Sequence, residues 1–129
     1  MTSIYAVTED ELQKQVVQWL HVALPPGCVF HHSPNEGRRH VAFKRKLKQM
    51  GTQYGWPDLE IFVPGDQAKH GISTSIFIEL KRMKGGKLNA NQEEMKARLL
   101  LAGCHWGLAR SVEQVHEILE PLVKLKAGV

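Results

Sequence analysis

Two stretches decide the fold of this 129-residue chain: GWPDLEIF (residues 55–62) and IFIELKRMKGGKLNANQ (residues 76–92). Each contains an apolar, β-prone run bounded by Gly or Pro, which is the pattern of a strand. The runs predict strands over residues 58–63 and 75–81, and a turn at 64–66 ends the first of them. We expect these strands to pair as antiparallel neighbours.

Helices and further strands are predicted on either side of this pair, from capping patterns, helical spacing and short apolar runs. The predicted helices cover residues 8–23, 39–50, 89–102 and a last segment from Ser111 through Leu122. The additional strands cover residues 28–32 and 105–109. The length suits one domain over residues 1–129. The order of elements predicts an α/β fold, in which a mixed central β-sheet is flanked by helices.

The chain is basic, with 17 Lys and Arg against 13 Asp and Glu and a net charge of +4. Such an excess favours polyanionic partners without identifying one. Six basic residues are concentrated in one segment: Arg38, Arg39, Lys44, Arg45, Lys46 and Lys48. Clustered Lys and Arg contact phosphates without reading base sequence. The segment is therefore a candidate DNA-binding surface, and a solvated helix face is the alternative.

Cys28 and Cys104 lie far apart in apolar surroundings without a CxxC pair, so we expect buried free thiols and no zinc centre. The sequence shows no leader pattern and no apolar run of membrane-spanning length, which favours the cytoplasm. His31, His32 and Asn35 are candidates to contact DNA or to line a site, and structural polar roles are the alternative.

The chemistry centres on three charged residues. Glu79 and Lys81 are one residue apart on a predicted strand, so both point to the same face of the sheet. Asp58 begins the neighbouring strand, and antiparallel pairing can bring its carboxylate beside Glu79. A hard divalent cation such as Mg²⁺ relieves the repulsion between two carboxylates. Lys81 could then orient or deprotonate a water and offset phosphate charge, which suits phosphodiester hydrolysis.

The same residues also allow a purely structural explanation. Glu79 and Lys81 can form an ion pair at a strand edge, and Asp58 can be a turn residue. The wider pattern decides between the two, because the quoted stretches resemble the VRR-NUC family of the PD-(D/E)XK nuclease superfamily over most of the chain. The matching features are the Gly before Pro57-Asp58, the tripeptide 79–81, the turn 86–88, Gln92 and Ala102-Gly103.

The resemblance implies a restriction-endonuclease-like core and assigns roles to the site residues. Asp58 and Glu79 would be metal ligands, Leu80 would contribute its backbone carbonyl, and Lys81 would be the catalytic lysine. The implied cofactor is Mg²⁺, with Mn²⁺ as a substitute.

Two further residues are expected near this site. The superfamily tends to place a first-helix Glu at the metal, and the sequence offers Glu9 and Glu11. Glu9 is favoured because it lies on the inward stripe, whereas Glu11 completes a capping box. Gln92 can face the sheet, where similar nucleases use a glutamine. Capping its own helix through Asn89 is the alternative role, and the two are compatible.

The family resemblance thus implies a Mg²⁺- or Mn²⁺-dependent, structure-specific DNA endonuclease. Small free-standing members resemble Holliday-junction resolvases, and a homodimer suits a four-way junction with two symmetric strands to cut. The alternatives are a flap, nicking or restriction-like nuclease that needs a partner, and a non-catalytic DNA-binding module.

Overall fold

The computed structural model describes residues 7–33 and 41–129, and its elements follow the predicted order. The helices are α1 (Glu9–Ala23), α2 (Val41–Gln49), α3 (Ala90–Leu101) and α4 (Val112–Leu119), with a short 3₁₀ helix η2 (Gly65–Gln67). The strands are β1 (Val29–His32), β2 (Leu59–Val63), β3 (Thr74–Leu80) and β4 (His105–Ala109).

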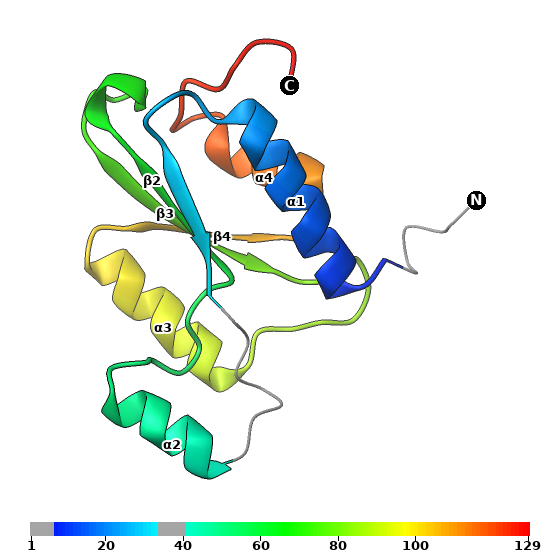
Figure 1. Cartoon of the computed structure of the whole chain (residues 1–129), viewed down its shortest axis with the longest axis vertical. Coiled ribbons are helices and arrows are strands. Elements are labelled where there is room, and N and C mark those ends of the chain that lie inside the picture. The colour runs from blue at the N-terminus through cyan, green and yellow to red at the C-terminus, as the bar shows by residue number, and fades with distance from the viewer. Residues whose placement is uncertain (1–6, 34–40) are drawn as a thin grey trace.

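The four strands form one mixed sheet in the order β1-β2-β3-β4 (Figure 1). β1, β2 and β3 pair in antiparallel fashion, which confirms the pairing predicted for the two central strands. β4 is parallel to β3, and α3 makes the crossover between them. The predicted architecture of a mixed sheet flanked by helices is therefore confirmed.

The main core lies between one face of the sheet and helices α1 and α4. Val16 and Leu20 of α1 and Leu119 of α4 are fully buried there with Ile76 and Ile78 of β3. The α1 residues recur at the spacing of one helix face, which explains why this helix packs as it does. The core thus fixes β3, the strand that carries Glu79.

Helix α3 packs on the opposite face of the sheet, where Met95 and Leu99 bury Phe77. Because side chains alternate along β3, Phe77 and Glu79 lie on this same face. The packing of α3 against Phe77 therefore holds its first turn near Glu79.

Helix α2 lies apart from the sheet, beyond α3 at the foot of the molecule (Figure 1). None of its residues is buried, and Val41 and Phe43 are 65% and 42% exposed. A helix without buried side chains depends little on packing against the main core.

Two details differ from the sequence predictions. Helix α4 ends at Leu119, before Leu122, because Pro121 has no N–H and cannot continue a helix. Cys28 and Cys104 are free as predicted, but they are only half-buried. Among the described residues, no helix has the length and apolar character needed to cross a membrane.

Candidate active site

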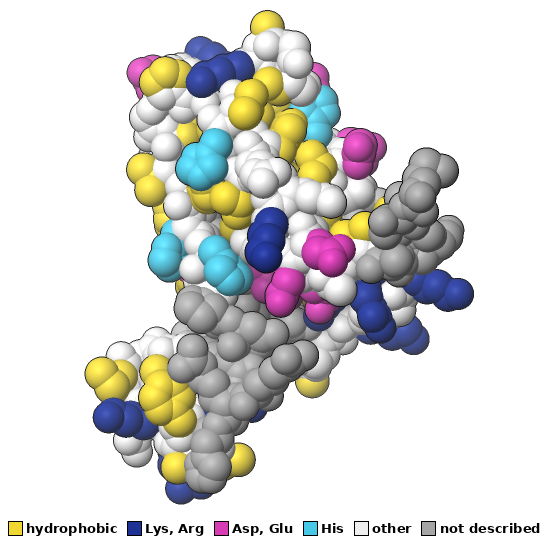
Figure 2. Space-filling view, turned by 45° about the vertical axis from the view of Figure 1, so that its right-hand side comes forward, with side chains coloured by type: hydrophobic (Ala, Val, Ile, Leu, Met, Phe, Trp, Pro, Cys, Tyr) yellow, Lys and Arg dark blue, Asp and Glu magenta, His cyan; other side chains and the backbone are white. Residues whose placement is uncertain are grey.

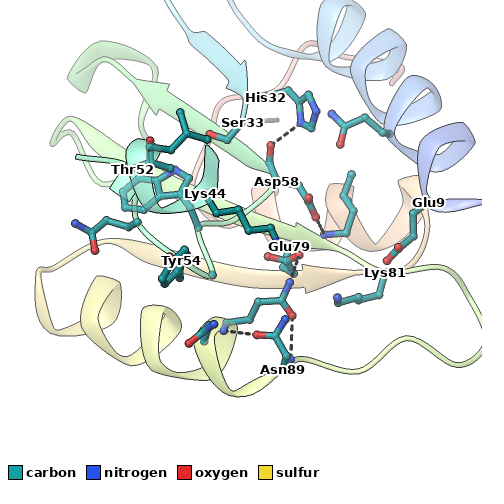
Figure 3. A pocket seen from close by; sticks show the side chains of 18 of the residues that line it. Glu9, His32, Ser33, Lys44, Thr52, Tyr54, Asp58, Glu79, Lys81 and Asn89 are labelled. Carbon is teal, nitrogen blue, oxygen red and sulfur yellow. Dashed lines mark hydrogen bonds between the residues drawn. The ribbon is translucent and has the colours of Figure 1, made fainter. Parts of the chain in front are cut away.

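The predicted catalytic and metal-binding residues border an open cavity of about 970 Å³. It lies where the start of β2, the end of β3 and the first turn of α3 meet, and α1 and α2 contribute to its walls. Figure 3 shows Asp58 and Glu79 near its centre, Lys81 and Glu9 on one side, and Lys44 reaching in from α2.

The register of β2 and β3 brings Asp58 and Glu79 together. Leu59 pairs with Ile78, so the residue before β2 lies beside the end of β3. The Oδ2 atom of Asp58 accepts a hydrogen bond of 2.7 Å from the backbone N–H of Leu80. Leu80 lines the cavity although its side chain belongs to the main core, so it offers backbone atoms to the site.

Glu79 is the one buried charged residue of the described chain, with 3% of its surface exposed. Its Oε1 atom accepts a hydrogen bond of 3.1 Å from Nε2 of Gln92, and its buried Oε2 has no hydrogen-bond donor. Burial, followed by the nearby carboxyl group of Asp58, raises the pKa of Glu79 to about 9, while Lys81 lowers it. The two carboxyl groups therefore favour a proton or a cation between them.

Gln92 caps its own helix and also contacts Glu79. Its backbone N–H and side-chain Oε1 form a capping box with Asn89, at 2.9 Å and 3.0 Å. Its remaining amide group is then fixed toward Glu79. The capping box thus orients the glutamine that holds the buried carboxylate.

Gly55 allows the loop before Asp58 to approach α3. Its φ is +74°, and a Cβ atom at this position would lie only 2.2 Å from the carbonyl oxygen of Asn91. No other residue fits this contact without displacing the backbone. The glycine of the GWPD stretch therefore sets the close approach of Asp58 to the Gln92 end of α3.

Lys81 follows β3, and its backbone N–H donates to the carbonyl of Ala109 at 3.1 Å. Its side chain lines the cavity. The alternative of a Glu79–Lys81 ion pair is not observed, since His116–Glu120 is the one pair within 4.0 Å in the described part of the chain. The ammonium group therefore remains available to a ligand of the cavity.

The two candidate glutamates of the first helix differ in position. Glu11 forms the capping box with Thr8 and does not line the cavity. Glu9 lines the cavity, and its negative charge adds to the rise in the pKa of Glu79. Within residues 7–33 and 41–129, no three His, Cys, Asp or Glu side chains are grouped to hold a metal ion. Glu9 therefore lies at the cavity wall and outside the Asp58–Glu79 pair.

The basic segment falls mainly on α2. Lys44 lines the cavity, Arg45 and Lys46 are exposed, and the Lys48 ammonium lies 4.4 Å from the centre of the Tyr54 ring. The predictions for Arg38, Arg39 and Asn35 fall outside the described residues.

The two histidines of β1 differ in position. His32 lines the cavity, and its Nδ1 atom lies 2.9 Å from the carbonyl oxygen of Asp58. His31 is exposed and pairs in register with Glu60.

Sequence reasoning did not find the anchor formed by Glu60. Its carboxylate accepts hydrogen bonds from Ser33 Oγ at 3.1 Å and from the Trp56 indole. These bonds tie the end of β1 and the loop before Asp58 to β2. Trp56 lies in the irregular loop before β2 and Glu60 lies within that strand, so no periodic pattern marks their contact.

The donor set fits a hard divalent cation. Mg²⁺ in proteins often takes one or two carboxylates, with water and substrate phosphate completing its oxygen ligands. Asp58, Glu79 and the Leu80 carbonyl could supply the ligands that come from the protein. The unpartnered, buried Oε2 of Glu79 supports this fit, because such an oxygen is costly unless a proton or a metal satisfies it.

No family model and no curated protein matches the sequence. A solved structure described as a VRR_NUC domain protein superposes with a TM-score of 0.70 and 27% identity, over 92% of this chain and 90% of that one. A second, described as a VRR_NUC domain, gives a TM-score of 0.57 and 21% identity over 89% and 97%. The resemblance to the VRR-NUC domain family is therefore confirmed, and the chain has the nuclease-type fold of that family.

Proposed function

We propose that the chain is a metal-dependent endonuclease that hydrolyses phosphodiester bonds in structured DNA. The observation that carries the proposal is the pairing of buried Glu79 with Asp58, beside Lys81, in an open cavity. Burying a carboxylate next to another carboxylate destabilises a fold unless a cation compensates it. Such a cost at the wall of a cavity supports a functional site.

In this proposal, Asp58, Glu79 and the Leu80 carbonyl hold Mg²⁺, for which Mn²⁺ can substitute. The metal supplies Lewis acidity toward a phosphate oxygen. Gln92 fixes Glu79 through Oε1 and leaves Oε2 as the donor atom. The Lys81 ammonium orients the attacking water and stabilises negative charge that develops on the phosphate.

The surface of α2 supports DNA as the substrate. Figure 2 shows acidic side chains gathered near the middle of one face, above a lobe where basic and hydrophobic side chains lie together. That lobe carries α2, which has no acidic residue and contributes Lys44 and Leu47 to the cavity. Phosphates bound along α2 would therefore lead toward Asp58 and Glu79.

We further propose that a homodimer cuts four-way junctions. One domain of this size holds one site, whereas resolution of a junction requires two symmetric cuts, which a twofold dimer provides. Flap, nicking or restriction-like cleavage with a partner protein is the second candidate, and it uses the same site.

The test is a comparison of substrates. The protein is incubated with a four-way junction, a flap, a duplex and single-stranded DNA, each with Mg²⁺, Mn²⁺ or a chelator. We expect paired cuts in the junction with either metal and none with the chelator. Faster cleavage of the flap or duplex would contradict the junction preference, and binding without cleavage of any substrate would contradict the enzyme assignment.

A further inference from the structure

Arg110 ties down the chain segment that follows Lys81. It comes directly after β4, and its Nη1 atom donates a hydrogen bond of 2.8 Å to the carbonyl of Arg82. Its Nη2 atom donates a second bond of 2.8 Å to the carbonyl of Gly86. One guanidinium thus joins two points of the loop over residues 82–88, which connects β3 to α3.

This loop packs directly on the lysine. A Cβ atom at Gly86 would lie 3.2 Å from Cδ of Lys81 and 3.8 Å from Oε1 of Glu9. The Gly86 backbone therefore lies against the hydrocarbon part of Lys81, on the side that faces α1. A lysine side chain is a flexible four-carbon chain with high conformational freedom. Such a contact therefore restricts the positions that its ammonium group can occupy.

Arginine suits this position because of its geometry. The planar guanidinium presents donors in a fixed fork and can hold two carbonyls at once, which the single ammonium of lysine does less rigidly. The backbone N–H of Arg110 is itself bonded to Oε1 of Gln114 at 2.7 Å, at the start of α4. Arg110 does not line the cavity, so it acts on the site through the loop.

We propose that Arg110 is a positioning residue for the active-site Lys81, which it holds in place by clamping the loop over residues 82–88. This inference rests on the nuclease function proposed above. A displacement of about 1 Å in a catalytic group can cost about 10²-fold in rate. Loss of the clamp should therefore slow the chemical step while the metal and DNA sites remain.

The experiment compares Arg110→Ala and Arg110→Lys with the wild-type protein, and uses Arg98→Ala as the control. Arg98 is exposed on α3 and lies outside the cavity. Cleavage with Mg²⁺ gives kcat and KM, hydrogen exchange reports on the amides of residues 82–88, and thermal denaturation reports on the fold. We expect Arg110→Ala to lower kcat by about 10²-fold with KM changed less than about threefold.

The remaining readouts separate positioning from a merely structural role. The amides of residues 82–88 should exchange faster in Arg110→Ala, and Arg110→Lys should recover part of kcat. Arg98→Ala should match the wild type. An unchanged kcat in Arg110→Ala would overturn the proposal, and so would a loss confined to KM, which would indicate direct DNA contact.

Gly86→Ala provides a second test if Arg110→Ala does not fold. Its methyl group pushes on the Lys81 side chain while the clamp is intact, so kcat should fall with KM preserved. Wild-type activity in Gly86→Ala would overturn the proposal. If the wild-type protein cleaves no DNA, the nuclease proposal fails, whereas hydrogen exchange in Arg110→Lys still shows whether the clamp orders the loop.

Discussion

Metal-free protein should lose stability as the pH rises, and Glu79 should account for the loss. Burial and the nearby carboxyl group of Asp58 raise the pKa of Glu79 from 4.5 to about 9 in the folded protein. Between these values the unfolded chain binds fewer protons than the folded one, so the free energy of unfolding falls with increasing pH. The limiting slope for one proton is about 1.4 kcal/mol per pH unit, which amounts to roughly 3 kcal/mol between pH 6 and pH 8.

The assay is denaturation by heat and by urea from pH 5 to pH 9 with a chelator present. Glu79→Gln is the matched control, because its amide oxygen can still accept from Gln92 while it carries no charge at any pH. Subtracting the stability profile of Glu79→Gln from that of the wild type removes the contribution of the histidines and leaves that of the Glu79 carboxyl. For a chain of this size, roughly 3 kcal/mol corresponds to a decrease of roughly 10 °C in Tm, which Glu79→Gln should not show.

Mg²⁺ should reverse this dependence, because the cation replaces the proton between Asp58 and Glu79. At 100 times its Kd, a ligand stabilises the folded state by about 2.7 kcal/mol. The stabilisation should grow from pH 6 to pH 8, since fewer protons compete with the metal. Identical pH profiles for the wild type and Glu79→Gln, or a Mg²⁺ effect that does not change with pH, would refute this reasoning.

The remaining predictions concern the loop before β2 and the surface of α2. Gly55→Ala should lower the free energy of unfolding by about 3 kcal/mol, because its methyl group meets the Asn91 carbonyl at positive φ. Gly51 has a φ of +107°, and no atom lies within 4 Å of the position its Cβ would take. Gly51→Ala should therefore lower the free energy of unfolding by only about 1 kcal/mol in the same denaturation assay. Equal losses in the two variants would contradict the contact between Gly55 and Asn91. Replacing Arg45 and Lys46 by Gln should change the salt dependence of DNA binding. The slope of the logarithm of the binding constant against the logarithm of the salt concentration should decrease in magnitude by about 2. An unchanged slope would exclude both residues as phosphate contacts.

Much of the fold followed from local patterns. The apolar run of β3 and the turn that ends β2 identified two neighbouring strands, and their pairing placed Asp58 beside Glu79. Helical spacing placed Gln92 toward the sheet, and the capping box separated Glu11 from Glu9. These features depend on residues that are close in sequence or on adjacent strands, so periodicity and capping rules are sufficient.

Other features depend on tertiary contacts that no local pattern reports. The Gly55 contact joins a loop to the first turn of α3, and the Arg110 clamp joins the end of β4 to the loop after Lys81. Glu60 accepts hydrogen bonds from Ser33 and Trp56, which lie on two segments that only the register of β1 and β2 brings together. Sequence alone could nominate the charged residues of the site, but it could not show what holds them in place.

The central claim is that Asp58, Glu79 and Lys81 form one metal-dependent hydrolytic site. The most direct measurement is single-turnover cleavage of a four-way junction by the wild type, Asp58→Ala and Lys81→Ala, with circular dichroism and junction binding measured on the same samples. With Mg²⁺, both variants should lose at least about 10³-fold in rate while they retain the fold and most junction binding. Cleavage by either purified variant at the wild-type rate, or wild-type cleavage in excess chelator, would contradict the claim.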